Sequence, residues 1–456
     1  MVFSAQRSSA TLPVHQAWYA GLEPMHWRVL AASFMGWIFD GFESFALFLI
    51  LPLALKSTLS PEQLATPAVW AGIAISTTLL GWGLGGVIGG TLADYIGRKR
   101  MMMYSVFLYA LFTGLTALSP NFWFLAGLRF LTGLAMGSEW STGVAMVAET
   151  WPNHARPKGC GILQSGFGFG TLLAALVWLV LGSTNPLGAE TWRLMFVVGA
   201  LPALFVLYIR RAVNESERWL TAVREKRWAA TEEDAQHLGG PARPAAKRPF
   251  TLTEIFREPE SRRRTLLALL LSLSTTVGWW AISSWLPAYT EQIAKAGGYA
   301  NPSGWATWVA LLYTVGAIAA YLISGFLADA IGRRNFLLFT YAGALIMTPV
   351  TYLWTRSPEM LLLVGFVNGF FTLGCAYSWM AIYLVELFTS TVRSTAASFI
   401  FNATRLIAWL FPILAGTMIH SFGGISRAAM TLGSIYVLGL IVPWFMPETR
   451  GKPLPE

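Results

Sequence analysis

Charge, cysteine and histidine are scarce in this chain of 456 residues. Only 12% of its residues are charged, about half of the roughly one quarter that is typical of soluble domains. A chain this poor in charge cannot cover its own surface with polar groups, which excludes a soluble protein. Its two cysteines, Cys160 and Cys375, lie in apolar runs, and its 5 histidines are scattered. This pattern excludes a disulfide framework, a redox pair and a metal cluster, and we expect neither a cofactor nor a metal.

Hydrophobic residues make up 55% of the chain and form long runs. Each run reaches about 20 residues, the length that a helix needs to cross a bilayer. The runs predict twelve membrane-spanning helices in two sets of six, and hence an all-α membrane protein built from two six-helix bundles. The expected spans lie near 29–54, 68–92, 101–118, 122–148, 160–181, 192–209, 265–286, 304–328, 336–354, 359–385, 394–419 and 427–446.

Polar segments divide the chain. We expect an arm over 1–28, a first bundle over 29–209, a linker over 210–264, a second bundle over 265–446 and a tail over 447–456. If the N-terminus lies inside the cell, most of the 32 Lys and Arg residues fall in cytoplasmic segments, where basic residues are enriched. Both termini are therefore expected in the cytoplasm. The formal charge of +9 then reflects topology in the lipid bilayer, and we expect no nucleic acid partner.

Two charged motifs occur once in each half of the chain. The first is a Gly-x3-Asp-x2-Gly-Arg pattern that contains Asp94 and Arg98, and it recurs with Asp329 and Arg333. The second is a Glu-x6-Arg pattern, and its copies follow at nearly the same offset in the two halves. These copies are Glu149 with Arg156 and Glu386 with Arg393. The halves are therefore expected to be structural repeats.

At these motifs the sequence resembles the major facilitator superfamily. Its first span also carries Asp40-Gly41-Phe42-Glu43, which is similar to the D-G-[FY]-D signature of aromatic acid:proton and sialic acid:proton symporters, with Glu43 in place of the second Asp. The segment Pro447–Gly451 resembles the tail of sugar porters, which keeps a neutral sugar open as a substrate. The resemblance implies a substrate site at mid-membrane between the bundles, and transport by alternating access.

Five ionisable residues lie inside the expected spans, and a charge near the bilayer centre costs at least ~2.5 kcal/mol. Asp40 and Glu43 are three residues apart and face the same way. Two such carboxylates cannot both ionise cheaply unless an arginine lies between them. We therefore expect them to couple transport to protons, with a structural hydrogen-bonded pair as the alternative. Glu139 is assigned to the same proton pathway, with a gate or an inter-helix hydrogen bond equally compatible with the sequence.

The two intramembrane arginines, Arg129 and Arg405, are expected to bind an anion. A guanidinium is a planar fork that suits a carboxylate and keeps its proton. The resemblance implies the same role, because arginines of spans four and eleven are implicated in substrate binding or coupling in related carboxylate carriers. For Arg129, a salt bridge to Asp40 or Glu43 is an equal alternative. Further substrate contacts are expected from Asn402, Tyr377, Trp280 and Gln164.

The loop motifs are expected to gate transport. Their residues lie at the cytoplasmic edge of the membrane, where salt bridges between the helix ends can hold one conformation and break in the next. The expected gating residues are Asp94, Arg98, Glu149, Arg156, Asp329, Arg333, Glu386 and Arg393. The alternative is that the basic residues only fix the orientation in the membrane, and the sequence gives Arg100, Lys158 and Arg334 no further role.

These observations predict a proton-coupled secondary transporter that imports a small organic carboxylate, such as an aromatic acid, sialic acid or a related monocarboxylate. We expect a monomer in the bacterial inner membrane. The absence of a Walker sequence favours an ion gradient over ATP as the energy source, and no clustered nucleophile and base indicate an enzyme. A sugar:proton symporter is one alternative. A transporter-like receptor or a passive anion pathway is another.

Overall fold

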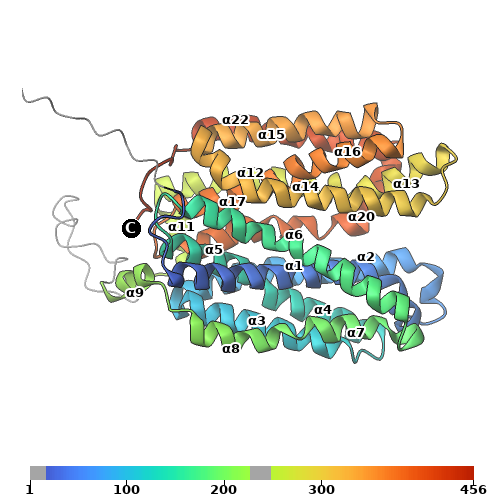
Figure 1. Ribbon diagram of the computed structural model, residues 1–456, viewed down its shortest axis with the longest axis horizontal. Helices are drawn as coiled ribbons and strands as arrows, with labels where there is room; N and C mark the ends of the chain where they lie inside the picture. The colour runs from blue at the N-terminus through green and yellow to red at the C-terminus, as the bar shows by residue number, and fades with distance from the viewer. Residues whose placement is uncertain (1–16, 226–247) are drawn as a thin grey trace, which may run out of the picture.

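A computed structural model describes residues 17–225 and 248–456 of the chain. The described residues are almost entirely helical, and the helices run side by side in two bundles (Figure 1). Part of the expected N-terminal arm and the middle of the expected linker lie outside the described residues. The blue-to-green helices α1 to α8 form the first bundle, and the yellow-to-red helices α12 to α22 form the second.

The helices of the first half begin and end near the expected spans. They are α1 (Pro24–Thr58), α2 (Pro67–Ile96), α3 (Arg98–Thr116), α4 (Phe122–Met136), α5 (Glu139–Thr150), α6 (Arg156–Thr184), α7 (Trp192–Gly199) and α8 (Pro202–Ala212). Two short helices lie between the bundles in sequence. They are α9 (Glu217–Arg224) and α11 (Thr251–Arg257).

The second half contains more interruptions. Its helices are α12 (Pro259–Trp280), α13 (Leu286–Ala296), α14 (Pro302–Ile331), α15 (Arg333–Pro349), α16 (Pro358–Gly369), α17 (Ala376–Tyr383), α18 (Arg393–Ala403), α19 (Arg405–Ala408), α20 (Phe411–Ser421), α21 (Ile425–Gly433) and α22 (Val437–Ile441). A π-helical segment over Phe370–Cys375 joins α16 to α17. Such segments are frequent at functional sites, and this one borders the cavity described below.

Nine helices of the described ranges are long and apolar enough to cross a membrane. They confirm the expected class of helical membrane protein. Each of the three other expected spans either begins with charged residues or is interrupted by a break in the helix. Of these, α3 begins with three basic residues, the span over 122–148 is divided between α4 and α5, and the span over 394–419 is divided among α18, α19 and α20.

The two Asp- and Arg-containing motifs form matching turns. Gly97 ends α2 with a φ of 102°, and Gly332 ends α14 with a φ of 89°. Glycine adopts this left-handed region readily because it has no Cβ. The chain therefore turns sharply into α3 and α15, and both motifs come to lie at the same end of the molecule. We call this end, which carries both motifs, α9, α11 and the C-terminal segment, the charged end (Figure 1).

Two glutamates cap the helices that follow these turns. Glu215 accepts hydrogen bonds from the first two backbone N–H groups of α3 at 3.0–3.3 Å. Glu448 accepts the corresponding bonds of α15 at 3.0 Å. These N–H groups have no partner within their own helices, and a carboxylate there also interacts favourably with the helix dipole. The halves thus share a third repeated feature, which follows the last helix of each half.

Small residues allow the bundles to approach closely. Helix α6 packs on α14, and α2 packs on α18. On α2, Gly86 faces Asn402 and Gly90 faces Ser398, and a methyl group at either glycine would overlap the facing side chain. The hydroxyl of Ser398 donates to the carbonyl of Gly86 at 2.7 Å. This close crossing sets the depth of α18 and therefore of Arg405, which directly follows it.

Candidate functional site

A cavity of about 90 Å³ lies between the two bundles, near the middle of the long helices. Side chains of α1, α2 and α6 line it from the first bundle, and side chains of α12, α14, α17, α18 and α19 line it from the second. Its wall is mostly aromatic and aliphatic. Among the described residues that line it, Arg405 is the one charged side chain. An anion in this cavity would meet a single cation in apolar surroundings.

The guanidinium of Arg405 lies between two aromatic rings. Its central carbon is 4.7 Å from the ring centre of Trp82 and 4.0 Å from that of Phe401, distances at which a ring stabilises a cation. Its Nη1 donates to the carbonyl of Phe401 at 2.6 Å. Within residues 17–225 and 248–456, its buried Nε has no hydrogen-bond partner. The rings thus fix the plane of the guanidinium and leave its Nε edge available to a carboxylate.

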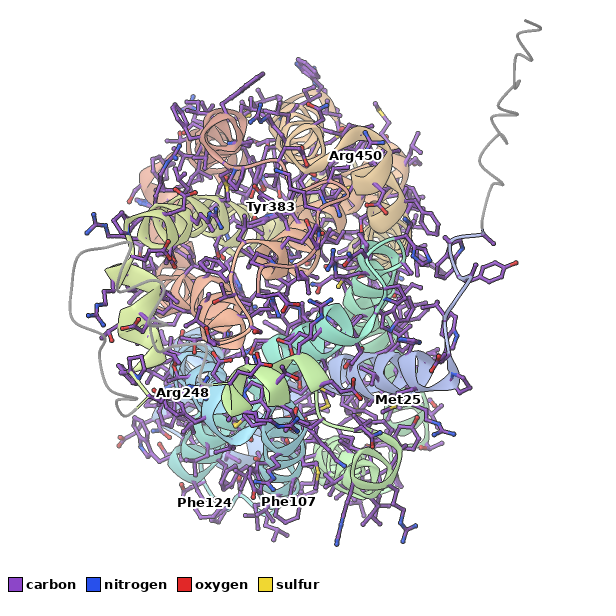
Figure 2. The ribbon with its side chains drawn as sticks, turned by 90° about the vertical axis from the view of Figure 1, so that its left-hand side faces the viewer. Met25, Phe107, Phe124, Arg248, Tyr383 and Arg450 are labelled. Atoms are coloured by element: carbon purple, nitrogen blue, oxygen red, sulfur yellow. The ribbon has the colours of Figure 1, made fainter. Side chains whose placement is uncertain are left out.

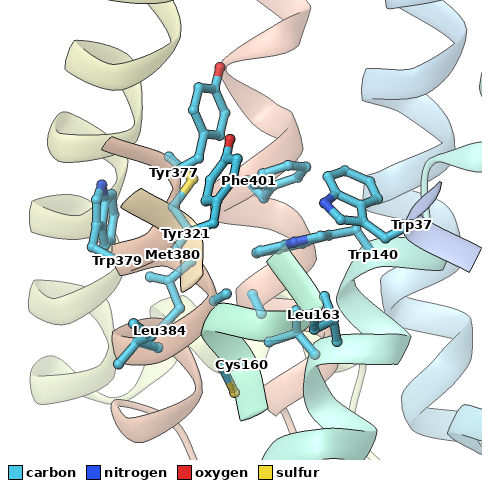
Figure 3. Packing of buried hydrophobic residues seen from close by; sticks show 14 of the residues in the cluster. Trp37, Trp140, Cys160, Leu163, Tyr321, Tyr377, Trp379, Met380, Leu384 and Phe401 are labelled. Carbon is cyan, nitrogen blue, oxygen red and sulfur yellow. The ribbon is translucent and has the colours of Figure 1, made fainter. Parts of the chain in front are cut away.

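An aromatic contact joins the bundles on the charged-end side of Arg405. Phe401 of α18 stacks on Trp140 of α5, with ring centres 3.8 Å apart and planes inclined by 16°. Trp37 of α1 lies 6.1 Å from Phe401, and Figure 3 shows these rings together with Tyr377. Phe401 precedes Arg405 by one turn on a chain that enters the bundle from the charged end. The stack therefore closes the cavity toward that end.

The structure distributes the other expected substrate contacts unevenly. Tyr377, Trp280 and Gln164 line the cavity, and Gln164 accepts a hydrogen bond from Nε1 of Trp140 at 2.7 Å. Asn402 accepts a long hydrogen bond from Nη1 of Arg405 at 3.5 Å, and its Nδ2 donates to the carbonyls of Ser398 at 2.9 Å and of Gly137 in the first bundle at 3.3 Å. Asn402 thus positions α18 and is not part of the cavity wall.

Arg129 lies inside the first bundle and not on the cavity wall. It forms an ion pair with Glu43, and its Nη2 donates to the hydroxyls of Thr116 at 2.9 Å and Thr132 at 2.8 Å. Of the two roles that the sequence allowed, this arrangement matches the salt bridge. Glu43 is accordingly paired with a cation.

Asp40 and Glu139 are also buried in the first bundle, but they differ from Glu43. Both are 0% exposed. None of their carboxylate oxygens has a hydrogen-bond partner among the described residues. The inter-helix hydrogen bond that was one alternative for Glu139 is therefore not made within that part of the chain.

At the charged end, the first motif copy is bound to both bundles. Asp94 lies 2.9 Å from Arg98 and accepts hydrogen bonds from the backbone N–H and the hydroxyl of Thr395 in the second bundle, at 2.8 and 2.6 Å. Glu149 lies 3.2 Å from Arg98 and 2.9 Å from Arg393 of the second bundle. All five of these residues are buried.

The second motif copy forms a related network. Arg333 lies 2.6 Å from Asp329 and 2.8 Å from Glu386. Arg156 of the first bundle approaches Glu386 at 3.9 Å, and Lys158 forms an ion pair with Asp329 across the bundles. The eight expected gating residues therefore lie together at one end. Lys158, to which the sequence gave no role, joins them.

A basic residue of the linker also contacts both bundles at this end. Arg248 donates to the carbonyls of Asp94 and Thr391, which belong to the first and second halves of the chain. Figure 2 looks onto the charged end and labels Arg248 and Tyr383. The described end of the linker therefore adds to the contacts that hold the bundles together here.

Sequence reasoning missed several aromatic residues of the site, and Trp37, Trp82 and Phe401 lie beside or near Arg405. A signal for Phe401 was present, because it precedes Arg405 by four residues, a spacing that places a ring beside a guanidinium on a helix. For the two tryptophans no comparable signal exists, since their position depends on how the bundles meet. Within residues 17–225 and 248–456, no group of three or more His, Cys, Asp or Glu side chains is arranged to hold a metal ion.

The model of the sugar (and other) transporter family matches residues 30–456. The chain belongs to this family, within the major facilitator superfamily. A putative metabolite transport protein of Haemophilus influenzae is 30% identical to this transporter over 94% of the chain and 98% of its own length. The sialic acid transporter NanX of Escherichia coli is 26% identical over 94% of the chain and 97% of its own length.

A solved structure shows the same fold. The proton:xylose symporter XylE of E. coli matches this transporter with a TM-score of 0.76 and 18% identity, over 94% of this chain and 98% of that chain. At this identity the likeness shows the fold alone. Family membership confirms the resemblance found in the sequence: the protein is an integral membrane transporter of small molecules and not an enzyme.

Proposed function

We propose that this transporter imports a small organic monocarboxylate together with protons across the bacterial inner membrane, as a monomer. The observation that carries the proposal is Arg405, the one charged side chain on the described cavity wall. A buried guanidinium without an anion is costly in apolar surroundings, and a carboxylate can accept hydrogen bonds from it. The sialic acid transporter among the relatives supports the same class. Aromatic acids and sialic acid are the candidate substrates.

Asp40 is the proposed site of the coupled proton. It lies on α1 between cavity-lining positions of the same helix and interacts electrostatically with Arg405. Without substrate, an ionised Asp40 balances the charge of Arg405. When a carboxylate docks on Arg405, a proton on Asp40 keeps the site neutral. Glu43 and Arg129 neutralise each other one turn away and add no net charge.

The charged-end network is the proposed inner gate, with this end in the cytoplasm because basic residues gather there. In the described conformation the network joins the bundles, so the cavity is closed toward this end. Rocking of the bundles would separate Glu149 from Arg393 and Asp329 from Lys158. Because these contacts are made in one conformation and broken in the other, their strength sets the balance between the two.

Thermal unfolding tests the carboxylate. We expect benzoate, nicotinate or N-acetylneuraminate to raise the Tm of the wild type and of Arg427→Ala, which removes an exposed arginine of the same half. Arg405→Ala should lose the response, because truncating one partner of a buried charge pair costs about 2–5 kcal/mol, or roughly 30-fold or more in Kd. A response to D-xylose alone would reassign the protein as a sugar:proton symporter, which the segment Pro447–Gly451 favours.

Flux into proteoliposomes tests the proton. With an inward proton gradient, the wild type and Glu62→Gln, which alters an exposed carboxylate, should accumulate the stabilising acid. Asp40→Asn should exchange the acid without accumulating it. Accumulation by Asp40→Asn would contradict the proposed proton site. Binding without flux would indicate a receptor, and wild-type flux that ignores the pH gradient would indicate a passive anion pathway.

A further inference from the structure

Glu139 belongs to a row of three carboxyl groups along one face of α1. Gly36, Asp40 and Glu43 are spaced four and three residues apart, so they face the same way on successive turns. A methyl group at Gly36 would overlap the carboxylate of Glu139, which shows that this carboxylate lies against the α1 backbone. The row therefore runs from Glu139 through Asp40 to Glu43, with a helical rise of about 5.4 Å per turn.

Within the described chain, one member of the row has a cation in contact. Arg129 pairs with Glu43. Asp40 and Glu139 are 0% exposed, and all of their carboxylate oxygens lack a hydrogen-bond partner among the described residues. Desolvation and mutual repulsion both oppose two ionised carboxylates in such a place. An ionised Asp40 has Arg405 as an electrostatic partner, so a proton on Glu139 removes the second negative charge without any further partner.

The ionisable groups around Asp40 and Glu139 come from several helices. Asp40 of α1 and Tyr109 of α3 interact electrostatically with Glu139. Through Asp40 the group extends to Glu43, which is paired with Arg129 of α4, and to Arg405 of α19. The hydroxyl of Tyr109 is buried, interacts electrostatically with Asp40 and Glu139, and has no hydrogen-bond partner in the described residues. A hydroxyl in this position can donate to a carboxylate or accept from a protonated carboxyl group. The Tyr109 hydroxyl is therefore compatible with both the protonated and the ionised form of a neighbouring carboxyl group.

We propose that Glu139 binds a second proton, which is transported in the same cycle as the proton on Asp40. This inference rests on the proposed function and adds its stoichiometry: two protons accompany one monocarboxylate, so each cycle moves one net positive charge inward. Because α1 begins at the charged end, Gly36 and the Glu139 carboxylate lie nearer that end than Asp40 does. Opening of the charged end therefore gives Glu139 a route to release its proton.

Infrared spectroscopy of the substrate-free protein tests whether Glu139 holds a proton. At neutral pH, Glu139→Gln should remove the carbonyl-stretch absorption of one protonated carboxyl group. The exposed control Glu62→Gln should remove only carboxylate absorption. Loss of carboxylate absorption in Glu139→Gln would show that Glu139 is ionised and would overturn the proposal. This measurement needs no substrate, so its outcome is independent of the carboxylate hypothesis.

Charge movement tests whether that proton is transported. The probe is whichever of benzoate, nicotinate and N-acetylneuraminate gives the largest thermal shift, and each is a monoanion at neutral pH. Wild-type uptake should carry one net charge per molecule and respond to membrane potential. Glu139→Gln should retain uptake driven by the pH gradient but move no net charge. An electroneutral wild type, or an unchanged charge ratio in Glu139→Gln, would overturn the second proton.

Two further results keep the test decisive. Gly36→Ala retains the Glu139 carboxyl group but displaces it from the backbone of α1. This variant should shift the carbonyl-stretch band of Glu139 and lower the net charge moved per substrate molecule. It therefore tests the proposal even if Glu139→Gln does not fold. If uptake by the wild type requires sodium and uptake by Glu139→Gln does not, Glu139 binds a sodium ion and not a proton, and the proposal is overturned. If no acid binds or moves at all, the proposed function fails, while the infrared result still decides the protonation of Glu139.

Discussion

The interiors of the two bundles differ although their motifs repeat. Away from the charged end, the first bundle buries three carboxyl groups, of Asp40, Glu43 and Glu139, and one arginine, Arg129. Away from the charged end, the described part of the second bundle pairs neutral hydroxyl groups: Tyr341 with Thr275 at 2.7 Å, and Tyr313 with Thr372 at 3.0 Å. Its intramembrane charge, Arg405, faces the cavity. The comparison indicates that the two bundles have different roles. The first bundle would bind the transported protons, and the second would hold Arg405 on a neutral framework where it can bind the anion.

Breaking the ion pair of the first bundle should have the largest effect. Glu43→Gln leaves Arg129 buried with a charge that the remaining threonine hydroxyls do not neutralise. Removing one partner of a buried pair typically costs about 3–5 kcal/mol. We expect a clear fall in Tm, measured on the purified protein by thermal unfolding.

The matched control for this pair is the double variant Glu43→Gln with Arg129→Gln. Because it removes both charges, it should regain much of the lost stability. A single Glu43→Gln variant as stable as the wild type would show that the first bundle tolerates an unpaired cation, and the contrast between the bundles would lose its energetic basis.

The two motif copies should differ in strength at the charged end. Asp94 is fully buried and accepts two bonds from Thr395, whereas the side chain of Asp329 is 26% exposed. Hydrogen bonds to charged groups contribute about 1.5–3 kcal/mol, and solvent weakens the exposed copy. Asp94→Asn should therefore favour opening of this end by roughly tenfold or more, and Asp329→Asn by less.

A native thiol reports this opening. Cys160 is buried one turn after Arg156, beside the charged network. In a Cys375→Ser background, maleimide should label Cys160 fastest in Asp94→Asn, more slowly in Asp329→Asn and slowest with both aspartates intact. Equal labelling rates in Asp94→Asn and Asp329→Asn would mean that the different burial of the two aspartates does not change how strongly each motif copy holds this end closed.

A change in the neutral network of the second bundle should have a smaller effect. Tyr341→Phe removes a hydroxyl that bonds to Thr275 and to the carbonyl of Leu271 at 2.9 Å. Losing hydrogen bonds of this kind costs about 0.5–1.5 kcal/mol each. We expect a modest fall in Tm, with the ratio of protons to substrate unchanged in proteoliposomes. A changed ratio would place proton coupling in both bundles.

Much of this difference between the bundles could be predicted from the sequence, because a charge within an apolar run is conspicuous and costly. The ionisable residues and repeated motifs were found in this way. Their partners were not, since the choice between Asp40 and Glu43 for Arg129 depends on helix rotation. Uniformly apolar spans carry no 3.6-residue period that would fix that rotation. For the same reason, the contact between Lys158 and Asp329 has no signal in the sequence.

The capping glutamates are different, because they lie in conspicuous segments of the sequence although their role as helix caps was not predicted. Each half ends in a Glu that is followed by Ser or Thr, as Glu215-Ser216 and Glu448-Thr449. Asn214 stands where the second half has Pro447. The structure shows that both glutamates accept bonds from the start of a helix in their own half. Short repeats near the ends of the halves therefore carry structural information that the spans do not.

The smallest predicted effect concerns the cap of the second half. Partial burial raises the pKa of Glu448, but the backbone N–H groups that bond to it outweigh this effect, and its pKa lies below the ordinary 4.5. A carboxyl group whose pKa is lowered by folding stabilises the protein above its unfolded pKa. That contribution disappears as the pH falls through the lowered value. The Tm difference between the wild type and Glu448→Gln should therefore be present at neutral pH and shrink below about pH 4.5.

The first half supplies the comparison for this effect. Glu215→Gln removes the charge from a cap with the same geometry at the start of α3, so it should also lower the Tm at neutral pH. The neutral amide of glutamine can still accept a hydrogen bond, but it lacks the charge that favours the positive end of the helix dipole. Each variant should therefore lose only part of its cap. A Tm difference for Glu448→Gln that stays constant as the pH falls would show that packing of the C-terminal segment, and not the charge of the carboxylate, holds the start of α15.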